Sequence, residues 1–350
     1  MNRRPGTPDP GPGTINSPLR VFSRRLQARW YAPRRPPLML LPLSALFGAA
    51  VAARRWLYAR GLLKAIRLPV RVVVVGNLAV GGSGKTPLVA WLARELSARG
   101  VRTGIVSRGY GRHEQDVRRV HADTPAAAAG DEARWLATVT GIPVAVGADR
   151  VAAVRALLSD TPLDIVLSDD GLQHYRMARD AEIVAVDARR GLGNGALLPA
   201  GPLREPPSRL SGVDAVVLKG DEDVSLPGSP TRLHMHCRLG AAVRLCDGKA
   251  RPLAEFANQP VRALAAIGDP ESFFRALEAG GLEVERIALA DHGPVADIVA
   301  RLPADRPLLM TAKDAVKLVA PPEHAWQVPL EVAFSETDAA TLLKRVLGDT

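Results

Sequence analysis

Cysteine is scarce in this chain, which has only Cys237 and Cys246 among 350 residues. Two cysteines exclude the disulfide framework of a small secreted protein and fit a reducing compartment. Apolar residues make up 47% of the chain, which is an ordinary share for a globular protein. The length allows two domains with sizeable cores.

Acidic residues are nearly missing from the first 67 positions, which contain Asp9 alone against 13 of the chain's 46 basic residues. This stretch therefore carries a charge of +12, while the other 33 basic and 35 acidic residues leave the rest of the chain at −2. A basic protein is a candidate for binding nucleic acid. Here, however, the positive charge is concentrated beside an apolar segment, which favours binding to an anionic membrane surface. We therefore expect no nucleic-acid partner.

The chain also lacks a long hydrophobic run. Its apolar segment, residues 38–53, has 16 residues, about 24 Å as a helix against a hydrocarbon core of roughly 30 Å. Arginines flank the segment, and Trp and Tyr side chains stand beside them, as at a membrane interface. We expect residues 38–60 to form a helix that lies in or dips into the cytoplasmic face of a membrane. A spanning helix and a buried core helix are the alternatives.

A glycine-rich stretch after this segment has the order of a phosphate-binding loop. Residues 72–75 are four valines typical of a buried strand, residues 88–96 predict a helix, and Gly84-Lys85-Thr86 stands between them. Backbone N–H groups and the helix start would face phosphates, while the Lys85 charge and Thr86 hydroxyl would serve phosphate and Mg²⁺. Ala79 stands where the strict pattern has glycine, yet the context still predicts a nucleotide triphosphate site. The expected ATP-binding residues are Ala79, Val80, Gly81, Gly82, Ser83, Gly84, Lys85 and Thr86.

Beyond residue 60, strand-like runs alternate with helix-like stretches, as in a parallel sheet covered by helices. The predicted fold is α/β: a P-loop NTPase-like parallel-sheet domain over residues 61–231, with a smaller α/β lobe over 251–350. Loose alternation predicts a two-stranded β-hairpin linker over 232–250. Residues 1–37 are expected to be a disordered basic tail.

A P-loop needs a second metal anchor at the end of a neighbouring strand. The buried strand predicted at 163–167 leads directly to Asp169 and Asp170. One carboxylate would hold Mg²⁺ together with Thr86, and the other would orient the metal's ligands or contact substrate. The competing interpretation is a strand-end turn with solvated aspartates.

Phosphoryl transfer to an alcohol also needs a proton acceptor and positive charge. By composition alone Asp131, in Gly130-Asp131-Glu132, favours a helix cap over a base, and a lone His292 favours a structural role. Arg108 and Tyr110 lie on a glycine-rich loop that would either meet an anionic substrate or form an ordinary turn.

Several segments resemble one family, the tetraacyldisaccharide 4′-kinases, or lipid A 4′-kinases. They run in family order from about residue 38 to about 318 and follow an apolar, leucine-rich helix like the family's own. The runs at 168–176 (Ser-Asp-Asp-Gly-Leu-Gln-His-Tyr-Arg) and 198–205 (Leu-Pro-Ala-Gly-Pro-Leu-Arg-Glu) are far more specific than the P-loop. The others are 75–78 with 81–87, 106–111, 130–132, 193–195, 290–292 and 310–317.

The resemblance implies an ATP-dependent kinase that phosphorylates the 4′-hydroxyl of a tetraacylated glucosamine disaccharide 1-phosphate, giving the bisphosphorylated lipid A precursor. It implies a location at the cytoplasmic face of the bacterial inner membrane, peripheral or monotopic. It also implies that Asp131 and His292 act together as the base, with Lys85 neutralising developing charge. The candidates for contacts with the acylated disaccharide are Arg108, Tyr110, Gln173, His174 and Arg204.

Two other functions share parts of this pattern. A membrane-associated P-loop NTPase that acts as a nucleotide-driven switch needs the P-loop and the aspartates but no base for a sugar hydroxyl. A membrane scaffold with a vestigial nucleotide fold would bind no ATP.

Overall fold

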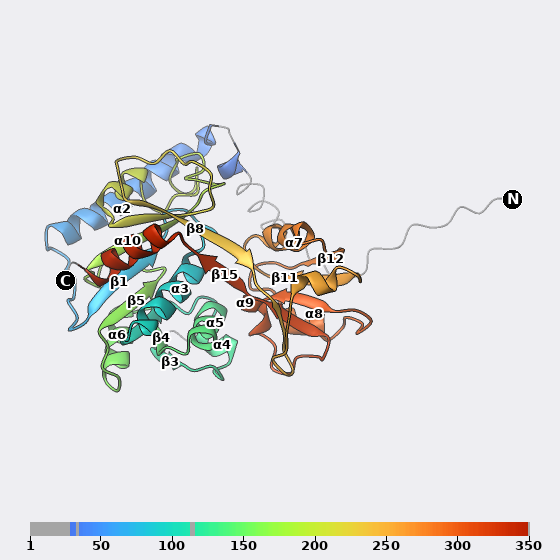
Figure 1. Cartoon of the computed structure of the whole chain (residues 1–350). Coiled ribbons are helices and arrows are strands. Elements are labelled where there is room, and N and C mark those ends of the chain that lie inside the picture. The colour runs from blue at the N-terminus through green and yellow to red at the C-terminus, as the bar shows by residue number, and fades with distance from the viewer. Residues whose placement is uncertain (1–28, 33–34, 113–115, 349–350) are drawn as a thin grey trace.

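The structure, a computed structural model, describes residues 29–32, 35–112 and 116–348 (Figure 1). Two lobes, each built on its own sheet, lie side by side, the second coloured orange to red in Figure 1. Most of the predicted disordered tail, residues 1–37, lies outside the described residues.

The larger lobe is built on a sheet that has nine strands in the described part of the chain. They are β1 (Arg71–Gly76), β2 (Thr103–Ser107), β3 (Arg118–Val120), β4 (Val144–Val146), β5 (Ile165–Asp169), β6 (Ala181–Asp187), β7 (Ala215–Lys219), β8 (Arg232–Leu239) and β15 (Leu330–Ala333). Their order is β15-β8-β7-β6-β1-β5-β2-β4-β3. The strands from β8 to β4 are parallel, and β15 and β3 are antiparallel at the two edges. The loop after β1 follows the carboxyl end of this central strand, and open parallel sheets bind ligands at the carboxyl ends of their strands.

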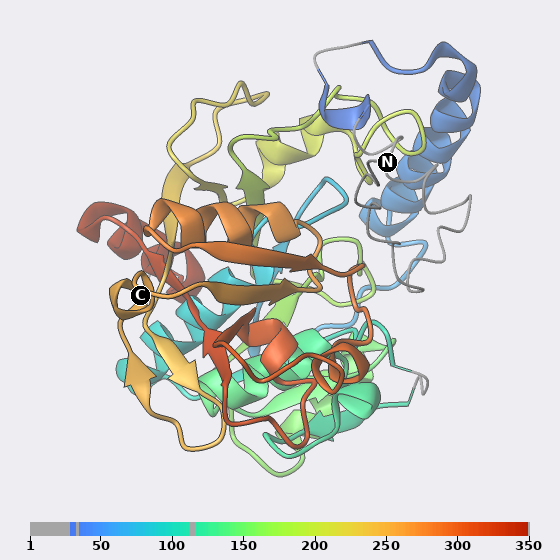
Figure 2. The ribbon, with the colours of Figure 1, turned by 90° about the vertical axis from the view of Figure 1, so that its right-hand side faces the viewer.

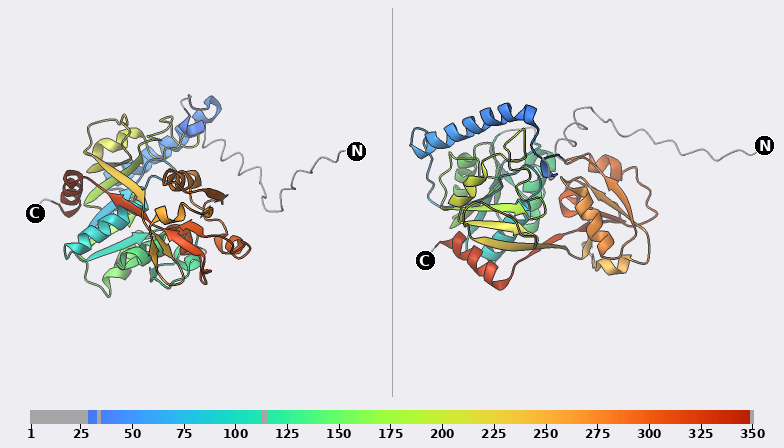
Figure 3. Two further views of the ribbon diagram at one scale, coloured as in Figure 1. Left: turned by 45° about the vertical axis from the view of Figure 1, so that its right-hand side comes forward. Right: turned by 90° about the horizontal axis from the view of Figure 1, so that it is seen from above.

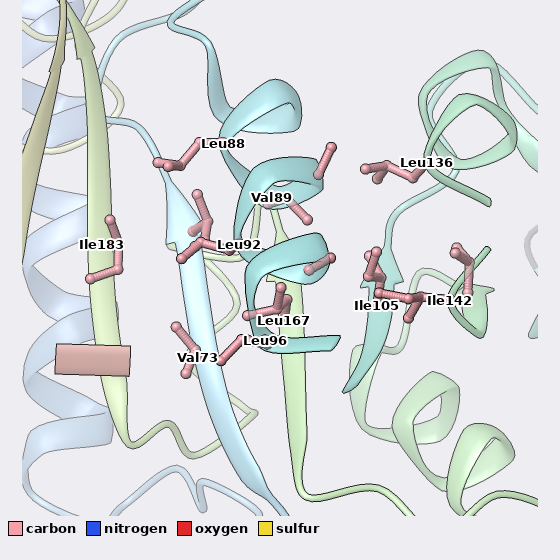
Figure 4. Close-up of a cluster of buried hydrophobic side chains, with 14 of the residues drawn as sticks. Val73, Leu88, Val89, Leu92, Leu96, Ile105, Leu136, Ile142, Leu167 and Ile183 are labelled. Atoms are coloured by element: carbon pink, nitrogen blue, oxygen red, sulfur yellow. The ribbon is translucent and has the colours of Figure 1, made fainter. Parts of the chain in front are cut away.

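Helices cover both faces of this sheet. They are α3 (Lys85–Ala98), α4 (Ala126–Ala129), α5 (Asp131–Thr140), α6 (Arg150–Leu158) and α10 (Glu336–Leu347), with the 3₁₀ helix η2 (Pro207–Gly212). The valines of β1 alternate between the faces, so Val73 and Val75 pack with α3, α5 and α10, while Val72 and Val74 pack with α6. Figure 4 shows the first core, in which Leu88, Leu92 and Leu96 of α3 point at the strands. Their spacing of four residues places them on one helix face.

The smaller lobe has a six-stranded sheet within the described residues. Its strands are β9 (Ala242–Arg244), β10 (Ala250–Arg251), β11 (Val261–Ala265), β12 (Val284–Ala288), β13 (Leu308–Thr311) and β14 (Ala325–Val328), in the order β10-β9-β14-β13-β11-β12. Its helices are α7 (Pro270–Ala279), α8 (Val295–Val299), α9 (Ala312–Ala315) and the 3₁₀ helix η3 (Leu253–Phe256). Figure 2 views this lobe from its own side, with α7 lying along the sheet. Phe256, Phe273 and Phe274 anchor one of its two cores.

The lobes are joined by two antiparallel strands, although not by the hairpin expected over 232–250. The chain leaves the larger lobe through β8 and returns through β15, with Leu239 opposite Leu330. β9 instead joins the second sheet, between β14 and β10. Local alternation predicts that a segment is a strand, but it carries no information on a partner so distant in sequence. After β15, helix α10 packs on the larger sheet, so the end of the predicted 251–350 lobe lies in the other core.

The apolar segment near the start of the described chain is helical, through η1 (Leu38–Leu40) and α2 (Leu41–Ala59). The 22 residues are long and apolar enough to cross a membrane, and 6% of the apolar window is buried. The helix ends at Ala59, so it occupies the expected range 38–60 and includes Arg54 and Arg55 beyond the apolar run. α2 lies along the face of the larger lobe opposite α10, as the right-hand view of Figure 3 shows.

Candidate active site

Glycines shape the loop between β1 and α3. Gly81 and Gly84 have φ values of 119° and 84°, which glycine adopts at little cost. A Cβ on Gly84 would lie 2.8 Å from Cε of Met235. Gly84 also immediately precedes α3, so the free N–H groups of the first helical turn face the loop. The predicted ATP-binding residues, 79–86, therefore share one loop and helix start.

Asp169 lies beside this loop because Val75 and Asp169 are register partners on β1 and β5. Its carboxylate is fully buried. Oδ2 accepts a hydrogen bond from Thr86 Oγ1 at 3.2 Å, while Oδ1 has no hydrogen-bond partner among the described residues. Burial, with the nearby Glu132 carboxylate, raises the pKa of Asp169 to about 7. Oδ1 is open only in the sense that no hydrogen bond from the described residues occupies it. Such a carboxylate oxygen and a neighbouring hydroxyl are suitable ligands for a hard divalent cation.

Asp170 has a φ of 50°, an uncommon value for a residue other than glycine. Its Oδ1 lies 3.5 Å from Nζ of Lys85, and its Oδ2 lies 3.2 Å from Nη1 of Arg204. Although burial opposes it, Lys85 and Arg204 lower the pKa of Asp170. Asp170 is therefore a carboxylate held between two cations.

Gln173 and His174 extend this group. Gln173 donates from Nε2 to Oε1 of Glu205 at 3.0 Å and accepts from Nη1 of Arg204 at 3.5 Å. The His174 Nε2 is buried with no hydrogen-bond partner in the described part of the chain. Burial, then the charge of Arg150, lowers the pKa of His174 to about 4. His174 thus presents a neutral imidazole at neutral pH.

Asp131 and His292 come from different lobes and meet directly. Nδ1 of His292 lies 2.8 Å from Oδ2 of Asp131, and Nζ of Lys317 lies 3.3 Å from the same oxygen. Asp131 opens α5 after Gly130, where a Cβ would lie 2.8 Å from the carbonyl oxygen of Tyr110. Although burial opposes it, the hydrogen bond from His292 and the charge of Lys317 lower the pKa of Asp131. The carboxylate is therefore ionised at neutral pH and oriented by two donors.

Arg108 and Tyr110 lie on the loop after β2. The Tyr110 side chain is 65% exposed, and its ring centroid lies 5.2 Å from that of His292. Arg108 is also exposed, and its charge acts on the buried Arg150. Both side chains can meet a molecule that approaches from solvent.

Three cations near the site are not singled out by the sequence argument. Lys313 lies 3.0 Å from Oε1 of Glu132, and Lys317 contacts Asp131. Arg150 is buried, which lowers its pKa to about 10, close enough to Asp169 and Asp170 for their charges to act on it. The two lysines belong to the family-like run 310–317, which was a usable signal. Arg150 begins an ordinary helix after its Asp149 cap and has no such signal.

A parallel sheet with a glycine loop, lysine and threonine after its central strand, beside a buried aspartate, defines a P-loop enzyme. Across the lobes, His292 holds the Asp131 carboxylate at 2.8 Å, which is a geometry that a proton acceptor for phosphoryl transfer requires. The chain belongs to the tetraacyldisaccharide-1-P 4′-kinase family, LpxK, whose family model matches residues 37–348.

Individual relatives agree with this assignment. The chain is 46% identical to tetraacyldisaccharide 4′-kinase of Chromobacterium violaceum over 335 residues, covering 92% of this chain and 98% of that protein. It is 47% identical to tetraacyldisaccharide 4′-kinase of Pseudomonas paraeruginosa over 298 residues, covering 85% and 89%. The crystal structure of LpxK from Aquifex aeolicus in complex with ATP has a TM-score of 0.77 and 30% identity, covering 89% of this chain and 99% of that one. The predicted P-loop α/β fold and the family resemblance are confirmed, and the chain is a kinase.

Proposed function

We propose that this chain transfers the γ-phosphoryl group of ATP to the 4′-hydroxyl of a tetraacylated glucosamine disaccharide 1-phosphate. The observation that carries the proposal is the Asp131–His292 contact of 2.8 Å, which joins a residue of each lobe. The P-loop is close to this contact, because a Cβ on Gly268 would lie 3.8 Å from Oδ2 of Asp291, the neighbour of His292, and 3.9 Å from the Gly82 nitrogen. A nucleotide switch needs no such oriented carboxylate next to its phosphate site. The names of the relatives supply the acceptor, and the ATP complex of the Aquifex aeolicus protein supplies the donor.

The loop of residues 79–86 would hold the phosphates of ATP through its backbone N–H groups, with Lys85 placing a positive charge against the transferred group. Thr86 Oγ1 and the open Oδ1 of Asp169 would hold Mg²⁺, with Asp170 close by. When bound, the ion would neutralise charge on the β- and γ-phosphates. Within the described residues no group of three or more His, Cys, Asp or Glu side chains could hold a metal. That fits Mg²⁺, which is usually bound through one or two carboxylates together with substrate phosphates.

The Asp131–His292 pair would take the proton as the 4′-oxygen attacks the γ-phosphorus. The O–P bond to the acceptor forms, the bond to the β,γ-bridging oxygen breaks, and ADP leaves with that bridging oxygen. Asp131 is ionised and can accept the proton directly, while His292 either orients it or takes the proton at Nε2. Because the two residues belong to different lobes, the pair exists only when the lobes are closed.

The acceptor would lie over Arg108, Tyr110, Gln173, His174 and Arg204. Arg204 carries the positive charge that suits the acceptor's 1-phosphate, and its contacts with Asp170 and Gln173 fix its position. The neutral His174 can donate or accept a hydrogen bond from a sugar hydroxyl.

The helix α2 would place the enzyme on the membrane that contains its acyl-chain substrate, at the anionic cytoplasmic surface of the bacterial inner membrane. Leu43, Leu46 and Trp56 are more than half exposed on it. Its other side is bound to the body near both ends, by Ser44 Oγ donating to the Leu197 carbonyl at 2.7 Å and by Tyr58 stacking 5.8 Å from Tyr175. A helix attached to the body near both of its ends favours a monotopic position over a span.

The test is transfer of label from [γ-³²P]ATP to the acylated disaccharide in detergent micelles. The wild-type chain should label the lipid, and Lys85→Ala and Asp131→Ala should abolish transfer while leaving the protein folded. Full activity in either variant would remove the assignment. Hydrolysis of ATP that is indifferent to the acceptor would instead favour a nucleotide-driven switch.

A further inference from the structure

Two aromatic residues upstream of the matched family region dock against loops of the larger lobe, Trp30 against the loop at 194–199 and Tyr31 against the P-loop. Trp30 is 7% exposed, its Nε1 donates to the Pro199 carbonyl at 3.1 Å, and its own carbonyl accepts from the Asn194 N–H at 2.8 Å. Tyr31 donates from its hydroxyl to the Val80 carbonyl at 2.9 Å. The family model begins at residue 37, so this contact lies outside the part of the chain that the family match covers.

The ring of Tyr31 also stacks with the Arg190 side chain, which reaches the other lobe. The guanidinium of Arg190 lies over its ring, 5.4 Å from the centroid. Nη2 of the same guanidinium donates to Oδ2 of Asp269 at 2.6 Å. Asp269 is the residue before α7, in the second lobe. Tyr31 and Arg190 therefore form a bridge from the P-loop to the lobe that carries His292.

Distances at a glycine of each lobe show that Tyr31, Arg190 and the second lobe all lie close to the P-loop. A Cβ on Gly81 would lie 3.7 Å from Nη1 of Arg190 and 3.9 Å from the Tyr31 hydroxyl. A Cβ on Gly268, next to Asp269, would lie 3.9 Å from the backbone nitrogen of Gly82. The small cavity behind the loop is lined by Tyr31, Val80, Gly82 and Arg190. The second lobe thus covers the P-loop at the point where Tyr31 and Arg190 support it.

We infer that Tyr31 and Arg190 are positioning residues for phosphoryl transfer: they hold the P-loop in its phosphate-binding shape and, through Asp269, keep the second lobe closed over it. Tyr31 fixes the loop through the Val80 carbonyl and orients the guanidinium by stacking. Arg190 then forms its ion pair with Asp269 from a side chain that is already ordered, which lowers the entropy cost of the pair. The inference rests on the proposed kinase function, since it assigns these residues a part in nucleotide use.

Trp30 and Tyr31 have a different role from the membrane helix α2 that follows them. Trp30 and Tyr31 are bound to the loops of the larger lobe, and Arg190 lies between lobes. Their loss should therefore change nucleotide binding and lobe closure, and leave attachment to vesicles unchanged.

The experiment compares full-length Tyr31→Phe, Arg190→Ala, Arg190→Lys and Asp269→Asn with Arg189→Ala. Arg189 is a matched control, because its guanidinium pairs with Glu222 on the surface at 3.2 Å. One readout is the affinity for a fluorescent ATP analogue, which needs no lipid acceptor. The others are KM for ATP, KM for the lipid, kcat, and the midpoint of thermal unfolding.

We expect Tyr31→Phe to weaken nucleotide binding about two- to tenfold, the loss of one hydrogen bond. Arg190→Ala and Asp269→Asn should each lower kcat/KM for ATP about tenfold, and their double variant should lose less than the product of the two. Arg190→Lys should recover part of the loss, and KM for the lipid and the unfolding midpoint should stay at the Arg189→Ala values. Nucleotide affinity and kcat/KM equal to the control in all of the variants would overturn the inference. So would losses explained by a lowered unfolding midpoint. A wild-type chain that binds the analogue but transfers no phosphate would count against the proposed kinase function instead.

Discussion

Replacing Asp131 by asparagine should remove the proton acceptor while leaving the site's shape intact. In the wild type, Nδ1 of His292 lies 2.8 Å from the Asp131 carboxylate, and the asparagine amide keeps an oxygen that can accept from the same donor. Lys317 keeps its other partner, Asp314, at 2.8 Å. The cost in unfolding free energy should therefore stay below the roughly 3 to 5 kcal/mol of a buried ion pair that loses one partner outright. The catalytic loss should be larger, because a positioned general base contributes about 10²- to 10⁴-fold, or about 3 to 5 kcal/mol of barrier.

The assay is steady-state transfer from labelled ATP to the acylated disaccharide over a range of ATP concentrations, with nucleotide affinity measured separately. We expect kcat to fall by about a thousandfold with little change in KM for ATP, the pattern of an interaction made only in the transition state. Asp123→Asn, an exposed carboxylate of the same lobe, is the matched control. A folded Asp131→Asn variant that keeps kcat within tenfold of wild type would refute a role for this carboxylate as base.

Other features give independent predictions. Removing divalent cations with EDTA should stop transfer, and adding back Mg²⁺ should restore it in wild type far better than in Asp169→Asn, because Oδ1 of Asp169 is the open ligand; activity in EDTA would contradict the metal assignment. Asp149 caps α6 by accepting from the Val151 and Ala152 N–H groups, so Asp149→Ala should cost about 1 kcal/mol of unfolding free energy. Although burial opposes it, the Ala152 N–H and Arg176 lower the pKa of Asp149. The Asp149 carboxylate therefore contributes to the free energy of unfolding above the ordinary carboxylate pKa, and this contribution is lost as pH falls through the lower pKa of the folded state. Urea melts at neutral and acidic pH should show that the difference in unfolding free energy between wild type and Asp149→Ala is smaller at acidic pH. Leu43→Glu with Leu46→Glu should reduce sedimentation with anionic vesicles while nucleotide affinity is unchanged; undiminished sedimentation would exclude α2 as the anchor.

The P-loop was predictable because every part of it is local. The valines at 72–75, the glycines and Lys85-Thr86 are contiguous, and the strand–loop–helix order follows from their side chains alone. Asp169 was predictable for a related reason, since a strand-end carboxylate must reach the same edge of a parallel sheet. The Asp131–His292 contact was not derivable from composition, which favoured a cap and a structural histidine. It followed from the resemblance, and its geometry from the fold.

The parts that sequence reasoning missed depend on distant partners. The strand at 232–239 pairs with Leu330–Ala333 rather than with the residues just after it, and no local pattern states such a pairing. Trp30 and Tyr31 resembled interface aromatics beside an apolar run, yet they hydrogen-bond to the body at Pro199 and Val80. Arg150 has the sequence context of a common helix start, and only its burial beside Asp169 and Asp170 distinguishes it.

The central claim is that the 4′-hydroxyl of the acylated disaccharide receives the γ-phosphate of ATP at the Asp131–His292 pair. The most direct measurement is to isolate the lipid product of a reaction with [γ-³²P]ATP and locate its new phosphate by ³¹P–¹H correlation NMR. The account predicts one added phosphate, coupled to the 4′ proton, in the wild-type reaction and none with Asp131→Asn. Phosphate at another position, or an unlabelled lipid beside hydrolysed ATP, would contradict it.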